Sequence, residues 1–243
     1  MKTKGITAAT LKWIAIISMF IDHFGWAMVS EGYCIAHGGF PPGGETFNQV
    51  LHILGRLAFP IFCFFIAEGY RHTHNAWRYA WRMLLFGFLS EVLFDYAFRR
   101  VWFSTEWQNI YFTLFLGLAV LIGWDLVTQK DFLQCSWWRK LIALAGLAFG
   151  VFLGFRLRTD YYGWGVLMIF VMYILRDHPL WRDLAAAAVL LLCGRSEIFA
   201  LPSLLLLHLY NGQRGRQNKY LFYWFYPGHL AFFCLLRFLL YGL

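Results

Sequence analysis

The feature that most constrains the fold is the recurrence of long apolar runs along the whole chain. A stretch of about 18 or more apolar residues is long enough to cross the hydrocarbon core of a bilayer as a helix. Hydrophobic residues make up 60% of the 243 residues and charged residues 14%, whereas a soluble domain carries about 25% charged residues. The sequence therefore predicts an all-α, polytopic transmembrane helix bundle.

The apolar runs predict nine helices, and no loop between them is long enough to hold a soluble domain. We therefore expect a single integral membrane domain over residues 1–243. The two shortest runs, 184–193 and 198–209, either cross separately or form one re-entrant pair. The expected helices are 9–30, 47–70, 76–98, 109–127, 138–155, 161–175, 181–194, 197–210 and 219–240.

The basic residues predict the orientation of the helices. With a cytoplasmic N-terminus and nine crossings, the inner side holds Lys2, Lys4, Lys12, Arg71, Arg78, Arg82, Lys130, Arg139, Lys140, Arg176, Arg182, Arg214, Arg216 and Lys219. The outer side holds only Arg99, Arg100, Arg156, Arg158 and Arg195. This is the positive-inside bias that is typical of a multi-pass membrane protein with a cytoplasmic N-terminus. The net charge of +8 then reflects topology and attraction to membrane lipids. Nucleic-acid binding is disfavoured because the charges are scattered over short loops.

Ionisable groups inside membrane helices are costly and mark functional sites, and six of those in the predicted helices stand out by their depth. A helix rises about 1.5 Å per residue, which places all six at similar depth, between the midplane and the outer surface. They are Asp22, His23, Arg56, Glu91, Asp95 and His229.

These residues allow a structural and a chemical interpretation. In the structural one, Arg56 pairs with Glu91 or Asp95 and pins helices together. In the chemical one, a carboxylate orients one ring nitrogen of His23 and leaves the other as a base. His229 either joins this site or simply hydrogen-bonds a backbone carbonyl.

A second polar cluster lies at the inner end of the helix predicted over 47–70. Glu68, Arg71 and His72 share one helical face, and Arg78 and Arg82 follow. The cluster is either a polar helix end or a seat for an anionic cytosolic molecule that carries several phosphates. No metal site is expected, because the histidines are dispersed and lack ligand spacing.

Several segments together resemble the TraX family. They are LKWIAIISMFIDHFG, GRLAFPIFCFFIAEGYRHT, SEVLFDYAF, FTLFLGL, YYGWGVL, LYNGQRG and KYLFYWFYPGHL, and they extend from Leu11 to about Leu230. The family is named for a conjugative-plasmid protein that acetylates the N-terminus of F-pilin. Leu93 departs from the pattern, which has proline there. The chain also resembles, more distantly, membrane acyltransferases that carry R-x(10)-H in their first helix. Lys12 and His23 have that spacing, but lysine lacks the planar fork of arginine.

The resemblance implies an acetyltransferase that uses acetyl-CoA as donor, without a metal. The acceptor would be a pilin N-terminus, another peptide, a glycan or a lipid. His23 would be the general base, oriented by Asp22 or another carboxylate. Arg56 or His229 would offset the oxyanion. The donor would be held by Lys12, Glu68, Arg71, His72, Arg78 and Arg82.

Two other classes of function remain in view. Intramembrane ionisable residues also build proton-coupled transporters, although the chain shows no inverted repeats or matching broken helices. A non-catalytic membrane component of a conjugation or secretion complex is the other class. That class would leave the buried histidines and carboxylates unexplained.

Overall fold

The computed structural model describes residues 5–243, apart from the side chain of Lys219. Lys2 and Lys4, which we predicted on the inner side, lie outside the described residues. Within this range the chain forms nine helical segments and no strand, which confirms the predicted all-α fold and helix number. The segments are α1 (Ala8–Phe24) continued by the π-helix η1 (Gly25–Cys34) and α2 (Ile35–His37), α3 (Gly44–Gly55) with α4 (Ala58–His72), α5 (Ala76–Arg99), α6 (Ile110–Thr128), α7 (Trp137–Arg156), α8 (Tyr162–Ile174), α9 (Pro179–Cys193), the 3-10 helix η2 (Arg195–Ala200) with α10 (Leu201–His208), and α11 (Lys219–Tyr241).

Four of these segments are long and apolar enough to cross a membrane. They are Ala8–His37, Gly44–His72, Ile110–Thr128 and Trp137–Arg156, and α8 is a shorter apolar helix. The chain is therefore a helical membrane protein. That all nine segments cross, with the N-terminus on the cytoplasmic side, stays a prediction.

The first helical segment is longer than the sequence predicted. It runs without interruption to His37, whereas we expected an end near residue 30. Asp22 and His23 therefore lie near the middle of this segment rather than in its outer half. Directly after them the backbone widens into the π-helix η1, a rare conformation that occurs frequently at functional sites.

The second predicted helix is interrupted in the middle. Arg56 and Leu57 form a turn between α3 and α4. Pro60 explains the break, because a proline lacks an N–H and its ring clashes with the carbonyl four residues earlier, here that of Arg56. The interruption places the polar side chain of Arg56 at a helix end, where its orientation is not tied to either apolar helix face.

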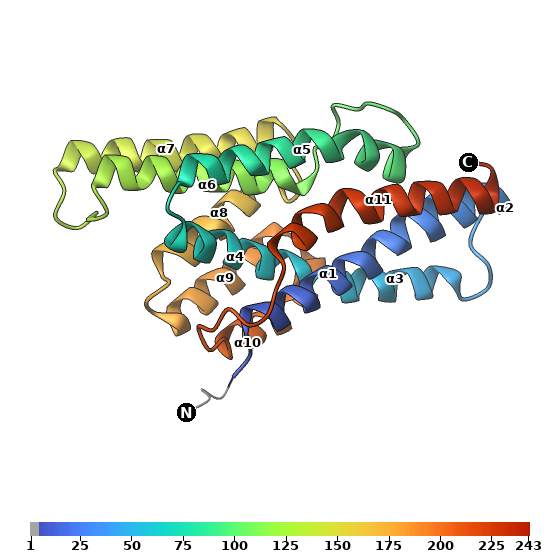
Figure 1. The fold of residues 1–243 in the computed structure, drawn as a ribbon, viewed down its shortest axis with the longest axis horizontal. Helices are drawn as coiled ribbons and strands as arrows, with labels where there is room; N and C mark the ends of the chain where they lie inside the picture. Colours follow the sequence, from blue (N-terminus) through green and yellow to red (C-terminus); the bar gives the residue numbers. More distant parts are fainter. Residues whose placement is uncertain (1–4) are drawn as a thin grey trace. The chain divides into compact units, whose positions relative to one another are not determined.

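The chain forms two compact units that interleave in sequence. Unit 1 comprises residues 1–62, 88–104 and 194–243, and unit 2 comprises 63–87 and 105–193. The helices α4 and α5 each contribute to both units. Figure 1 traces the chain through the helices of both. The expectation of a single domain stays a prediction.

In unit 1, α1 packs against α3 and α11. At one end, the N–H groups of Ala8 and Ala9 donate to the carbonyls of Gln213 and Arg214. Elsewhere in the unit, the fully buried Arg237 of α11 donates to the carbonyls of Tyr96 and Ala97, both at 2.6 Å. These carbonyls belong to the last turn of α5, where carbonyls commonly lack intrahelical partners, and that of Tyr96 also accepts the N–H of Arg100. Unit 1 therefore holds α11 on both α1 and the end of α5.

In unit 2, α6, α7 and α8 pack against one another. The hydroxyls of Tyr70 and Tyr173 both donate to Oδ2 of Asp125, at 3.0 and 2.7 Å. These residues lie near the C-terminal ends of α4, α6 and α8. The predicted alternation of inner and outer loops requires these three ends to lie on one side, and the structure brings them together.

Candidate functional site

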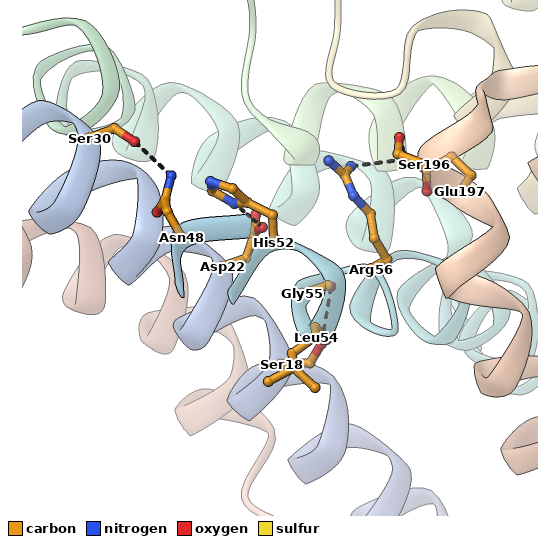
Figure 2. Close-up of polar contacts among 10 residues, drawn as sticks. All are labelled: Ser18, Asp22, Ser30, Asn48, His52, Leu54, Gly55, Arg56, Ser196 and Glu197. Carbon is orange, nitrogen blue, oxygen red and sulfur yellow. Dashed lines mark hydrogen bonds and ion pairs between the residues drawn. The ribbon is translucent and has the colours of Figure 1, made fainter. Parts of the chain in front are cut away.

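A row of polar contacts connects α1 and η1 to α3 and η2 within unit 1 (Figure 2). Along the row, Nδ2 of Asn48 donates to Oγ of Ser30 at 3.1 Å. Nδ1 of His52 lies 2.8 Å from Oδ1 of Asp22, and Nη1 of Arg56 lies 3.0 Å from Oε1 of Glu197. These polar contacts therefore lie along one face of α3 and the turn that follows it.

Glycine at position 55 allows Asp22 to reach this row. A Cβ atom added to Gly55 would lie 2.6 Å from both Cγ and Oδ1 of Asp22, well inside van der Waals contact. The hydroxyl of Ser18, one turn before Asp22 on α1, donates to the carbonyls of Leu54 and Gly55 at 2.5 and 3.0 Å. These carbonyls end α3 at the break, so Ser18 satisfies acceptors that the helix leaves open.

His23 points to another element and pairs with His229 of α11. Nδ1 of His23 lies 2.6 Å from Nε2 of His229, and Nδ1 of His229 lies 2.8 Å from the carbonyl of Phe225. A carbonyl only accepts, so Nδ1 of His229 carries the proton and its Nε2 is an acceptor in the neutral ring. Nδ1–H of His23 must then donate to that Nε2. This chain of hydrogen bonds leaves Nε2 of His23 as the nitrogen with a free lone pair.

Aromatic rings surround the two histidines. The edges of Phe98 and Tyr226 approach the ring of His23, with centroids 4.9 and 5.9 Å away. His229 is buried and stacks on Phe225, whereas His23 is only half-buried. Nε2 of His23 makes no hydrogen bond to any residue that the structure describes. The pair therefore presents one oriented, unprotonated nitrogen in an apolar setting.

The partner of His23 differs from the expected one. We expected Asp22 or a carboxylate of the third helix to orient its ring. Asp22 instead binds His52, because neighbouring residues on a helix point about 100° apart. Over residues 5–243 no carboxylate hydrogen-bonds to His23, and a second imidazole takes that place. His229 binds a backbone carbonyl and also contacts His23, and its part in a reaction stays a prediction.

The carboxylates of α5 are buried, as expected for residues at membrane depth. Oδ2 of Asp95 accepts the N–H of Ser104 at 2.7 Å, so it fastens the loop that follows α5. Glu91 is buried one turn earlier. Glu197 is a carboxylate partner of Arg56 that the sequence did not suggest. Pairing of Arg56 with Glu91 stays a prediction.

The basic cluster of unit 2 lies at the end of α4 and the start of α5. Nε2 of His72 lies 3.1 Å from Oε1 of Glu68, which confirms that these two residues share a face. Glu68 binds His72 rather than Arg71, and Arg71 has no carboxylate partner among the residues described. Arg71, Arg78 and Arg82 are all exposed. Exposed guanidinium groups in one cluster are suited to binding phosphates.

Lys12 lies in unit 1 and contributes a second positive region. Its Nζ is 5.5 Å from the ring centroid of Phe222, and Arg214 is close enough to act on its charge. Along α1, Lys12 is 11 residues before His23, which corresponds to about 16 Å of helix. In the described part of the chain, no set of three or more His, Cys, Asp or Glu side chains is arranged to hold a metal ion.

Two ionisable residues of the polar row, His52 and Glu197, were not singled out from the sequence. His52 has a visible signal, because Asn48, His52 and Arg56 recur every four residues within an apolar run and predict a polar helix face. Glu197 had no such signal, since it is the first residue of the helix predicted over 197–210, and in the structure it lies in a short 3-10 helix. Its contact with Arg56 joins residues 141 positions apart.

Comparison with known proteins identifies the family. The profile of the TraX protein family matches residues 7–237. A curated relative, the probable fimbrial assembly protein FimC, serogroup H1, of Dichelobacter nodosus, is 28% identical over 257 residues, which cover 94% of this chain and 94% of that protein. No solved structure matches. Because the family profile covers nearly the whole chain, including the His23–His229 and His52–Asp22 pairs, this protein belongs to the TraX family.

Proposed function

We propose that this protein is a membrane-embedded acetyltransferase that moves an acetyl group from acetyl-CoA to an acceptor at or beyond the membrane. The observation that carries this proposal is the oriented His23–His229 pair, in which Nε2 of His23 makes no hydrogen bond to a described residue. A neutral histidine with one fixed and one free nitrogen is the usual form of a general base.

In the proposed reaction, Nε2 of His23 removes a proton from the amine or hydroxyl of the acceptor as it attacks the thioester carbonyl. His229 positions the ring through its 2.6 Å contact. Both nitrogens of His229 are engaged, so it is poorly placed to stabilise the oxyanion as well. Arg56 is the better candidate, because its side chain is 27% exposed and carries a fixed positive charge.

The donor is a substrate that carries phosphates, and the basic residues support its binding. In unit 1, Lys12 and Arg214 place two positive charges about 16 Å along α1 from His23. In unit 2, the exposed Arg71, Arg78 and Arg82 form the other basic cluster. Each of these two regions, taken by itself, is a candidate to bind the phosphates of CoA, and His72 and Glu68 lie at the edge of the one in unit 2. Their position on the inner side follows from the predicted topology, which gives access to cytosolic acetyl-CoA.

The relative from Dichelobacter nodosus suggests the kind of acceptor. That protein is named a probable fimbrial assembly protein, and the TraX resemblance implies acetylation of a pilin. We propose that the acceptor is a pilin-like peptide presented in the bacterial inner membrane. A glycan or lipid acceptor would be detected in the same assay by replacing the peptide.

The experiment is acetyl transfer by the purified protein in detergent, with radiolabelled acetyl-CoA and a pilin peptide. His23→Gln should lower the rate by about 10²–10⁴-fold, the range that general base catalysis supplies. His37→Gln is the matched control, because His37 stacks on Tyr33 and touches neither histidine pair. Full activity of folded His23→Gln would refute the proposal. Proton-coupled uptake into liposomes without CoA release would favour a transporter instead.

A further inference from the structure

The His52–Asp22 pair is a second oriented histidine that the reaction above does not use. Nδ1 of His52 lies 2.8 Å from Oδ1 of Asp22, and both side chains are partly exposed, at 18% and 23%. A carboxylate accepts, so Nδ1–H of His52 donates to it. Nε2 of His52 makes no hydrogen bond to any described residue. The ring centroid of Trp26 lies 5.0 Å from that of His52. His52 therefore also presents one open nitrogen.

Two glycines create the space for this pair. Gly55 lets Asp22 approach α3, as described above. A Cβ atom on Gly25 would lie 3.2 Å from Cε1 of His52 and 2.8 Å from Oδ1 of Asn48. Since a side chain at either glycine would collide with the pair or its neighbour, the close approach of α1 and α3 depends on both positions.

The charges around the two histidines differ. Around the His52–Asp22 pair lie His23 of α1, Glu197 of η2 and Arg56 of the turn that follows α3. Arg56 and Glu197 compensate each other at 3.0 Å, which leaves Asp22 as the counter-charge for an imidazolium at His52. An imidazolium at His23 would contact the ring of His229 and lie near His52, and it would have no carboxylate hydrogen-bonded to it among the described residues.

When two titratable side chains of one site have different environments, one commonly acts as the general acid and the other as the general base. Near His52 a bound proton has a carboxylate partner, so this histidine is suited to donate a proton. Near His23 a bound proton has none, so this histidine is suited to start neutral and accept one. The rings are close enough for the charge of one to act on the other.

We propose that His52, held by Asp22, is the general acid that protonates the departing sulfur of CoA. This assignment rests on the proposed acetyl transfer. As the acceptor nitrogen or oxygen bonds to the acetyl carbon, its proton passes to Nε2 of His23. The carbon–sulfur bond breaks, and Nε2–H of His52 gives its proton to the sulfur, so that CoA leaves as a thiol. One proton then moves from His23 to solvent and one from solvent to His52.

A membrane setting makes such an acid useful. A thiolate is stabilised by water in solution, but an unpaired charge in an apolar environment is costly. The rings of Trp26, Phe98 and Tyr226 surround the two histidines. Protonation at the moment of bond cleavage avoids a free thiolate among these rings.

The test compares two donors that differ in their need for an acid. Acetyl-CoA releases a basic thiolate, whereas the acetyl thioester of 5-thio-2-nitrobenzoate releases a stabilised thiolate that leaves without a proton. His52→Gln should lower kcat with acetyl-CoA by about 10²–10⁴-fold and by less than about 10-fold with the activated donor. His23→Gln should be slow with both donors.

Asp22→Asn is the second variant, because asparagine keeps the size of the side chain and removes only its charge. It should show the same rescue by the activated donor, with the KM for acetyl-CoA unchanged. His37→Gln serves as the control for both variants. Equal losses with the two donors would overturn the assignment. Absence of transfer by the unmodified protein would overturn the proposed function, and this assignment with it.

Discussion

The close approach of α1 and α3 at Gly55 makes a prediction that is independent of any enzymatic activity. In Gly55→Ala the new Cβ atom would lie 2.6 Å from Cγ of Asp22, whereas non-bonded carbons prefer about 3.5–4.0 Å. The helices must therefore separate by about 1 Å. That shift would stretch the 2.8 Å contact between Asp22 and His52 beyond hydrogen-bonding distance.

The energetic cost follows from the same geometry. Overpacking of a buried contact costs about 1–3 kcal/mol, and the helical preference of alanine over glycine returns about 0.5–1 kcal/mol. Gly55→Ala should therefore destabilise the protein by about 1–2 kcal/mol. Gly123→Ala in α6 is the matched control, because an added Cβ there meets nothing within 4 Å. It should be neutral or slightly stabilising.

The measurement is the unfolding midpoint of both variants in detergent, together with the ¹⁵N resonances of His52. We expect a lower midpoint and a changed Nδ1 signal for Gly55→Ala only. If Gly55→Ala is as stable as Gly123→Ala and its His52 resonances are unchanged, the close approach of the two helices is refuted.

Two further predictions concern buried polar contacts. Arg56→Met leaves the carboxylate of Glu197, which is 5% exposed, without its guanidinium partner, and it should destabilise the protein by up to about 3 kcal/mol. The double variant Arg56→Met/Glu197→Gln should recover most of this loss, measured as the unfolding midpoint. Equal losses in the single and double variants would contradict the pairing. Tyr173→Phe removes one of two hydroxyls from Oδ2 of Asp125 and should cost about 1–2 kcal/mol. Adding Tyr70→Phe removes the second donor, so the double variant should lose more than the sum of the single variants, and strict additivity would argue against a shared carboxylate.

Much of the fold could be predicted from local sequence. Nine apolar runs gave nine helical segments, because the length of an apolar run is itself the requirement for crossing a bilayer. The exceptions have local causes of their own. Pro60 breaks the second helix at Arg56, and the π-helix after His23 extends the first helix to His37.

The candidate site was predicted only in part. His23 and His229 were singled out separately, but their contact joins residues 206 positions apart. Asp22 was one of the carboxylates expected beside His23, but it contacts His52, because neighbouring residues on a helix point in different directions. His52 was missed although it lies four residues from Arg56, since one polar residue in an apolar run also suits a solvated helix face.

By itself the sequence determined that this chain is a helical membrane protein of the TraX family, with costly ionisable residues inside its helices. These properties follow from composition, run length and local motifs. Only the tertiary structure decided that His23 meets His229, that Asp22 meets His52 and that Arg56 meets Glu197. Such pairings depend on the rotation of each helix about its axis. In helices that are apolar nearly all round, the packing of glycines and small side chains sets that rotation, and the hydrophobic pattern does not record it.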